Sequence, residues 1–266
     1  MTHDNPASSQ PLLHPSVAVG VGAVLVYALV TNSIQLSSGI SYLDWFKTAA
    51  STWRVGVLSL AAGSSVLLAF VLRNRWRHLW SDPFQLRTTR VMKLAMVVWW
   101  VTIAVRLAGV KWSEIPQALL VAVLVSGVLV GFAEETLFRG IFLRCMRESG
   151  RNEAAAAIWT SVAFGLFHLP NMFMGMGMIG AVQIVLAALS GGLLYVFRRQ
   201  YGVIWPAMVA HGAWDISTFL SGGFSSAWLA QATLPMMAAQ IVLGIGVLVS
   251  IYRHDRQTVV LPAAAR

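Results

Sequence analysis

Residues 116–137 read PQALLVAVLVSGVLVGFAEETL, an apolar stretch that is long enough to cross a lipid bilayer as a helix. A helix needs about 20 apolar residues to span the hydrocarbon core. Two acids, Glu134 and Glu135, lie near the end of this stretch, at a depth where a charge facing lipid is costly. The stretch therefore predicts a membrane helix whose acidic end faces protein.

The rest of the chain has the composition of a membrane protein. Of its 266 residues, 57% are hydrophobic and 11% are charged, and the mean hydropathy is +0.69. A soluble domain has about 25% charged residues. Apolar segments predict eight spans, at roughly 17–36, 55–72, 92–110, 116–137, 154–169, 177–197, 203–221 and 234–252.

We therefore expect an all-α polytopic membrane protein, a bundle of about eight transmembrane helices that forms one integral membrane domain over residues 1–266. The fourth helix is expected to continue past its apolar part, because residues 144–149 contain no Gly or Pro. Met1 to Ser16 carry no Lys or Arg, so we expect the first apolar segment to be retained. The single cysteine, Cys145, excludes an intrachain disulfide.

Basic residues predict the orientation of the chain. Of the 19 Lys and Arg residues, 15 fall on one side, after the second, fourth, sixth and eighth spans. Basic loops stay cytoplasmic, so both termini are predicted to be cytoplasmic. The compact chain favours a bacterial source and hence the inner membrane. This asymmetry, with anionic lipid headgroups as partners, explains the net charge of +9 without nucleic acid.

Three short runs place ionisable residues inside predicted spans. At a rise of 1.5 Å per residue, Glu134, His168, His211 and Asp215 lie about 12–24 Å from the cytoplasmic end, so they can meet at one level. Such residues usually face the bundle interior and mark function. The runs are EETLFR at 134–139, FGLFH at 164–168 and HGAWD at 211–215.

Helical spacing assigns faces to these residues, because positions i and i+4 are neighbours. Glu135 and Arg139 form such a pair, which makes Glu135 the structural anion and leaves Glu134 free to face a cavity. His211 and Asp215 can point at one atom by the same spacing, and Phe164 is expected to pack beside His168.

Each feature alone has an ordinary structural reading. A buried His is usually a hydrogen-bonded core residue, and a lone Glu–Arg pair is usually a link between helices. Arg106, near the end of the third span, is expected to extend toward the interface. The three runs together favour a reaction site, because they place acids and histidines at compatible depths.

The three runs have the forms EExxxR, FxxxH and HxxxN/D, in this order on successive spans. The pattern resembles the CPBP family of CAAX proteases and bacteriocin-processing enzymes, also called the type II CAAX prenyl endopeptidase or Abi family. The resemblance covers roughly residues 90–250, as a catalytic core. It implies a hydrolase, an intramembrane endopeptidase that cleaves a membrane-associated protein or peptide by CAAX-type or C-terminal-tail processing.

The resemblance also implies roles for individual residues. Glu134 and His168 would activate a water, while His211 and Asp215 would stabilise the oxyanion and Glu135 with Arg139 would support the site. Many family members carry Asn where this chain has Asp215. An ionised Asp cannot donate a hydrogen bond, so Asp215 is either protonated or orients a protonated His211.

Metal use is the main open alternative within this reading. Glu134, His168 and His211 could ligate zinc and leave a position for water, but the chain has no HExxH motif. The Glu–His scheme needs no metal, and we favour this glutamic-type mechanism with no required cofactor.

Two other classes of function remain open. Buried acids and histidines also serve transporters and proton relays, although the sequence has no internal repeat to support a transporter. The same fold could also serve as a non-catalytic scaffold or immunity protein. The sequence predicts neither the oligomeric state nor the substrate.

Overall fold

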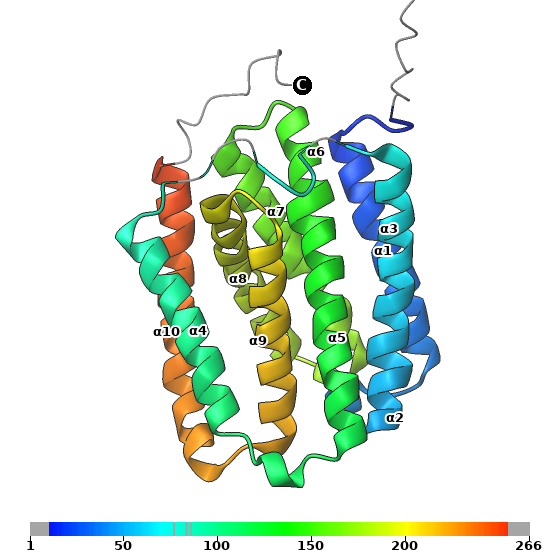
Figure 1. Cartoon of the computed structure of the whole chain (residues 1–266), viewed down its shortest axis with the longest axis vertical. Helices are drawn as coiled ribbons and strands as arrows, with labels where there is room; N and C mark the ends of the chain where they lie inside the picture. Colours follow the sequence, from blue (N-terminus) through cyan, green and yellow to red (C-terminus); the bar gives the residue numbers. More distant parts are fainter. Residues whose placement is uncertain (1–10, 77, 83–84, 86, 255–266) are drawn as a thin grey trace, which may run out of the picture.

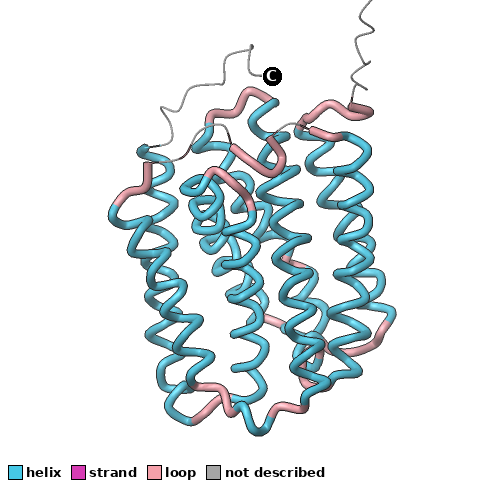
Figure 2. The backbone as a smooth tube through the Cα atoms, viewed as in Figure 1, coloured by secondary structure: helices cyan, strands magenta, loops and turns pink. Residues whose placement is uncertain are grey.

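The computed structural model describes residues 11–76, 78–82, 85 and 87–254, and these residues form helices and loops without strands (Figure 2). The α-helices are α1 (Val17–Ser37), α2 (Ala49–Ser51), α3 (Leu58–Asn74), α4 (Arg90–Ala108), α5 (Gln117–Glu135), α6 (Leu143–Glu148), α7 (Glu153–Phe167), α8 (Ile179–Tyr201), α9 (Trp205–Phe224) and α10 (Ala227–His254). Five shorter elements complete the list: the 3-10 turns η1 (Tyr42–Asp44) and η3 (Trp112–Glu114), and the π-helical turns η2 (Thr52–Val57), η4 (Thr136–Phe142) and η5 (Met172–Met176).

The predicted membrane bundle is confirmed. Within the described residues, six continuous helices are long and apolar enough to cross a membrane, among them Ala49–Asn74 and Gln117–Glu148. Two other predicted spans form helices that fall outside this group. Helix α7 has only 15 residues, and α9 is less apolar because it carries site residues such as His211 and Asp215.

The fourth span continues past its apolar part, as predicted, but it is not a regular α-helix throughout. Its central turn, Thr136–Phe142, is π-helical, and all seven of its residues are buried. A π-helical turn bonds residue i to i+5 and occurs often at functional sites. This wider turn follows directly after the two acids of the EETLFR run, so the irregularity lies at the predicted site.

Helices α5 and α9 pack against each other at glycines. A Cβ atom added at Gly131 would lie 2.3 Å from the carbonyl oxygen of Met208, and one added at Gly212 would lie 2.6 Å from that of Gly127. Small residues four apart allow membrane helices to approach closely. This close approach brings the acidic end of α5 against His211 on α9.

The start of the first helix and the end of the last helix lie on the same side of the bundle. Helix α1 begins and α10 ends at the same end of the bundle, at the top of Figure 1. The chain termini themselves, together with Arg77, Arg256 and Arg266 from the charge count, lie outside the described residues. An even number of membrane crossings is expected to leave the start of α1 and the end of α10 on the same side, and the described residues show this arrangement.

The same end contains a buried ion-pair cluster that corrects one expectation. Arg198 and Arg199, assigned from sequence to a cytoplasmic loop, are only 1% and 4% exposed. Asp82 lies between two arginines, with Oδ2 3.0 Å from Nε of Arg198 and Oδ1 2.6 Å from Nη1 of Arg147. Arg147 also pairs with Glu153 at the start of α7. Part of the basic charge therefore binds acids within the protein instead of lipid headgroups.

Candidate active site

Glu135 is the centre of a buried polar contact between α5 and α9. Its Oε1 accepts a hydrogen bond from Nη1 of Arg139 at 2.7 Å and contacts Nδ1 of His211 at 2.8 Å. The side chains of Glu135 and Arg139 are fully buried. Since a carboxylate oxygen accepts, Nδ1 of His211 is the donor. One acid thus fixes both the arginine of its own helix and the histidine of the facing helix.

The second ring nitrogen of His211 faces two other acids. Nε2 lies 3.9 Å from Oε2 of Glu134 and 3.8 Å from Oδ2 of Asp215. The Asp215 side chain is 21% exposed, whereas that of His211 is 7% exposed. The spacing predicted from sequence therefore brings His211, Asp215 and Glu134 around one point.

Glu134 differs from its neighbour in its surroundings. Its side chain is 10% exposed, and its buried Oε2 accepts no hydrogen bond from the residues that the structure describes. An acceptor-only group in this position is costly to bury unless it has a ligand or water to bind. Glu134 is thus the acid that is left to interact with something outside the protein chain.

His168 lies at the C-terminal end of α7, partway through the bundle. Helix α7 is roughly 22 Å long, which is less than the hydrocarbon core of about 30 Å. Nδ1 of His168 lies 2.9 Å from the carbonyl oxygen of Phe164. A carbonyl can only accept, so Nδ1 carries the proton and Nε2 keeps its lone pair. His168 is half-buried and presents a ring nitrogen that can take a proton.

Phe164 joins the separate parts of the site. Its ring packs edge-to-face against His168 at 5.2 Å and against His211 at 5.5 Å between ring centroids. The guanidinium of Arg139 lies over the same ring at 4.3 Å. Glu134 and His168 make no direct hydrogen bond or ion pair with each other among the described contacts. One aromatic side chain, Phe164, therefore packs against both histidines.

The π-helical turn is held from α8 on two sides. Nη2 of Arg139 donates to the carbonyl oxygen of Gly191 at 3.0 Å, and Arg198 donates to the carbonyl oxygen of Arg139. Gly191 and Arg198 are seven residues apart and so lie on one face of α8. Because Arg198 also binds Asp82, contacts run without a break from the buried cluster to Glu135.

A comparison with protein families finds a match for this chain. Residues 116–217 match the family model described as type II CAAX prenyl endopeptidase Rce1-like. This match supports the family that the sequence predicted, and at family level it supports an intramembrane CAAX-type endopeptidase. A search of the curated proteins found no match.

The matched region extends from the start of α5 into α9, and all seven site residues predicted from the sequence lie within it. They are Glu134, Glu135, Arg139, Phe164, His168, His211 and Asp215. The first three spans and the last one lie outside the match, so the wider core of 90–250 remains a prediction.

The structure places Arg106 differently from what the sequence predicted. It was expected to extend to the interface, but its Nη1 donates to Oγ1 of Thr218 at 2.8 Å and its guanidinium lies 4.1 Å from the centroid of the Trp214 ring. Trp214 and Thr218 lie on either side of Asp215 in α9. Arg106 therefore braces the segment that carries Asp215, a contact between α4 and α9 that periodicity within one helix does not predict.

The described side chains do not form a metal centre by themselves. Among the described residues, no group of three or more His, Cys, Asp or Glu side chains is arranged to hold a metal ion. The alternative zinc set of Glu134, His168 and His211 is therefore not supported by the arrangement of these side chains. The expectation that no cofactor is required stays a prediction.

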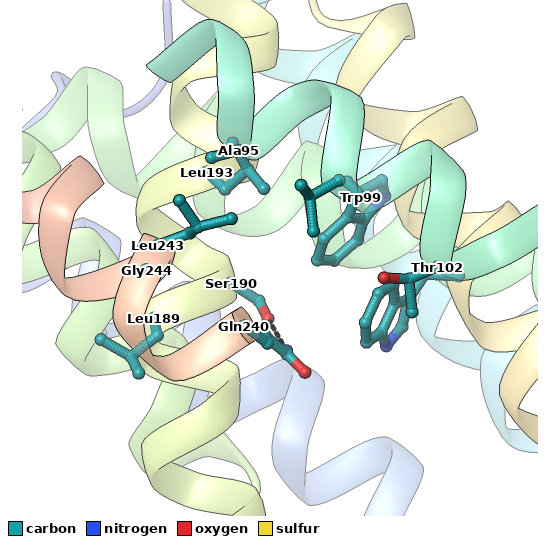
Figure 3. Close-up of a pocket in the computed structure, with 11 residues that line it drawn as sticks. Ala95, Trp99, Thr102, Leu189, Ser190, Leu193, Gln240, Leu243 and Gly244 are labelled. Carbon is teal, nitrogen blue, oxygen red and sulfur yellow. Dashed lines mark hydrogen bonds between the residues drawn. The ribbon is translucent and has the colours of Figure 1, made fainter. Parts of the chain in front are cut away.

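A mainly apolar cavity lies beside the site without including it. It is enclosed by α4, α8, α9 and α10, with Trp99 and Thr102 on α4 and a hydrogen bond from Gln240 to Ser190 at 2.9 Å (Figure 3). Trp214 also lines it, but Glu134, His168, His211 and Asp215 do not. The cavity is thus separated from the ionisable residues by the tryptophan that precedes Asp215.

Proposed function

We propose that this protein is an intramembrane endopeptidase that hydrolyses a peptide bond of a membrane-associated protein or peptide, with water activated by Glu134 and His168. The observation that carries the proposal is the carboxylate of Glu134, whose buried Oε2 accepts no hydrogen bond from the described residues and lies beside His211, with His168 and His211 packed on one aromatic ring. The protein would lie in a bacterial inner membrane, as the compact chain suggests, and its charge asymmetry would place both termini in the cytoplasm.

In the proposed reaction, a water bridges Glu134 and the free Nε2 of His168, which do not contact each other directly. The carboxylate of Glu134 takes a proton from the water as its oxygen attacks the carbonyl carbon of the substrate. The C–N bond then breaks, and the proton passes to the leaving amine. General base catalysis of this kind contributes about 100- to 10,000-fold to a rate.

The other side of the site would stabilise the charge on the carbonyl oxygen. Nδ1 of His211 is committed to Glu135, so Nε2 is the nitrogen available to the substrate. Asp215 lies 3.8 Å from this nitrogen, close enough to favour a protonated ring that donates to the oxyanion. This scheme uses Asp215 to orient His211, without a hydrogen bond from Asp215 itself.

The proposal includes independence from metal. Treatment of the protein in liposomes with a membrane-permeant chelator should leave the cleavage rate unchanged, because each proton transfer in the scheme uses a protein side chain. Complete loss of cleavage that zinc restores would contradict the glutamic-type mechanism and favour a metalloprotease.

Two histidines with the same local bond provide a matched test. Nδ1 of His254 bonds the carbonyl oxygen of Ser250 at 3.1 Å, as Nδ1 of His168 bonds that of Phe164, but His254 ends α10 at the basic end of the bundle. The parent, His168→Ala and His254→Ala proteins in liposomes would receive a library of membrane-associated peptides, with products identified by mass spectrometry. Cleavage by the parent and His254→Ala but not by His168→Ala is expected. Equal cleavage by all three would contradict the mechanism.

A further inference from the structure

The loop between α1 and α2, residues 38–48, packs against α9 and η5, next to the candidate active site. The ring of Phe46 stacks on that of Phe219 in α9, with centroids 3.5 Å apart and an angle of 9°. On its other side, Ser41 packs so closely on η5 that a Cβ atom at Gly175 would lie 2.2 Å from Oγ of Ser41. The loop is therefore held between α9 and the segment that follows His168.

The contact on α9 continues the line of site residues. His211, Asp215 and Phe219 are each four residues apart, so they lie along one face of the helix. Phe46 covers the end of this line by stacking on Phe219. The part of the loop around Phe46 thus packs on α9 about one helical turn after Asp215.

Tyr42 in this loop contacts α8 through its hydroxyl. Its hydroxyl accepts a hydrogen bond from Nε2 of Gln183 at 3.0 Å, and Oε1 of Gln183 accepts one from Nδ2 of Asn171 at 3.0 Å. Its ring packs on Trp45, with centroids 4.6 Å apart. A tyrosine hydroxyl has one proton to donate. Because Gln183 occupies an acceptor site, that proton is left for another partner.

The electrostatic surroundings of Tyr42 connect it to the site. Burial, with a smaller contribution from the carboxylates of Asp215 and Glu134, raises the pKa of Tyr42 to about 12 against the opposing effect of the bond from Gln183. Tyr42 therefore lies within electrostatic reach of both acids and keeps its proton at neutral pH. It is a neutral donor beside groups that, when ionised, can only accept.

We propose that Tyr42 is a further catalytic residue, whose hydroxyl donates a hydrogen bond to the carbonyl oxygen of the scissile bond. Tyr42 would be a second donor beside Nε2 of His211, because ionised Glu134 and Asp215 have no proton to give and Nδ1 of His211 is bound to Glu135. The bond would strengthen as negative charge develops on the oxygen. The inference rests on the proposed endopeptidase function, and it assigns this function a residue outside the matched region.

The first test is Tyr42→Phe, which removes the hydroxyl and keeps the ring on Trp45. Removal of one oxyanion donor lowers kcat on the order of 100-fold, with KM little changed. Tyr201→Phe is the matched control, because Tyr201 is 48% exposed at the end of α8. A kcat for Tyr42→Phe equal to that of the parent, or a change in KM alone, would overturn the proposal.

A second measurement separates this proposal from the proposed function, because it does not depend on cleavage. Fluorotyrosine placed at position 42 would be titrated by fluorine NMR in the parent and in Asp215→Asn. Removal of the nearby negative charge should shift the titration at position 42 to lower pH. An unchanged titration at position 42 would show that Tyr42 does not face the site and would overturn the proposal even if cleavage fails for another reason.

Discussion

Glu134 and Glu135 are neighbours in sequence, yet the fold gives them different surroundings. Glu135 is fully buried and binds both Arg139 and His211, while Glu134 has no hydrogen bond from the described residues. The difference arises because only Glu135 has a cation four residues further along the helix. In the proposed mechanism, Glu135 therefore supports the site and Glu134 reacts with water.

Glu135→Gln is expected to destabilise the protein, because it leaves the buried guanidinium of Arg139 without its anion. Breaking a buried ion pair by changing one partner costs about 3–5 kcal/mol. The free energy of unfolding in detergent, followed by helical circular dichroism, measures this effect. Glu148→Gln is the control on the same continuous helix, since its pair with Arg144 is partly exposed and should contribute no more than about 1 kcal/mol. Equal stabilities for the two variants would contradict the structural role of Glu135.

Much of the residue-level arrangement could be predicted from spacing within single helices. The i,i+4 rule placed Arg139 on Glu135 and Phe164 beside His168, and both contacts are present. Contacts between distant segments could not be predicted in this way. Arg106 on Trp214 and Tyr42 on Gln183 depend on how α4 and the α1–α2 loop pack, for which helical periodicity carries no information.

At the scale of the elements, the site depends on the close packing of α5 and α9. Gly212 follows His211 directly and touches the backbone of α5 at Gly127. The GxxxG spacing of Gly127 and Gly131 is visible in the sequence, but its partner helix is not. The π-helical turn Thr136–Phe142 was not predicted either, because the bond from Arg198 to the carbonyl oxygen of Arg139 comes from another helix.

Gly212→Ala should force α5 and α9 apart, since a Cβ atom there would lie 2.6 Å from a backbone oxygen. Overpacking of this kind costs about 1–3 kcal/mol, and a shift of about 1 Å in His211 can lower a rate about 100-fold. Thermal unfolding in detergent and the cleavage rate measure the two effects. Gly222→Ala on the same helix meets open space and should keep the stability and activity of the parent. A Gly212→Ala protein as stable and active as the parent would contradict the packing argument.

At the scale of the whole molecule, the buried cluster around Asp82 joins the α3–α4 loop to α6, α7 and α8. Hydropathy correctly predicted the positions of the spans, but it treated these arginines only as charges in loops. Their burial depends on Asp82, which the sequence shows as an isolated acid in a basic loop. The stability of the protein at low pH should therefore show how far this cluster stabilises the fold.

Burial alone would raise the pKa of Asp82, but Arg198, Arg147 and Arg199 together hold it well below its usual range. A carboxyl with a lowered folded pKa stabilises the protein fully above its unfolded pKa of about 3.9 and loses this contribution as the pH falls below that value. The parent should therefore lose stability below about pH 4. Asp82→Asn should be less stable at pH 7 and lose less stability on acidification. Thermal unfolding in detergent from pH 7 to pH 3 measures both; parallel curves for parent and variant would contradict the role of Asp82.

The central claim is that the carboxylate of Glu134, whose buried Oε2 accepts no hydrogen bond from the described residues, activates water for peptide hydrolysis inside the membrane. Its most direct test compares the rate of peptide cleavage by the parent, Glu134→Gln and Glu148→Gln proteins in the same liposomes, with folding checked by circular dichroism. The account predicts that the parent and Glu148→Gln cleave at similar rates and that Glu134→Gln, folded like the parent, loses cleavage. Cleavage by folded Glu134→Gln at the parent rate would contradict it.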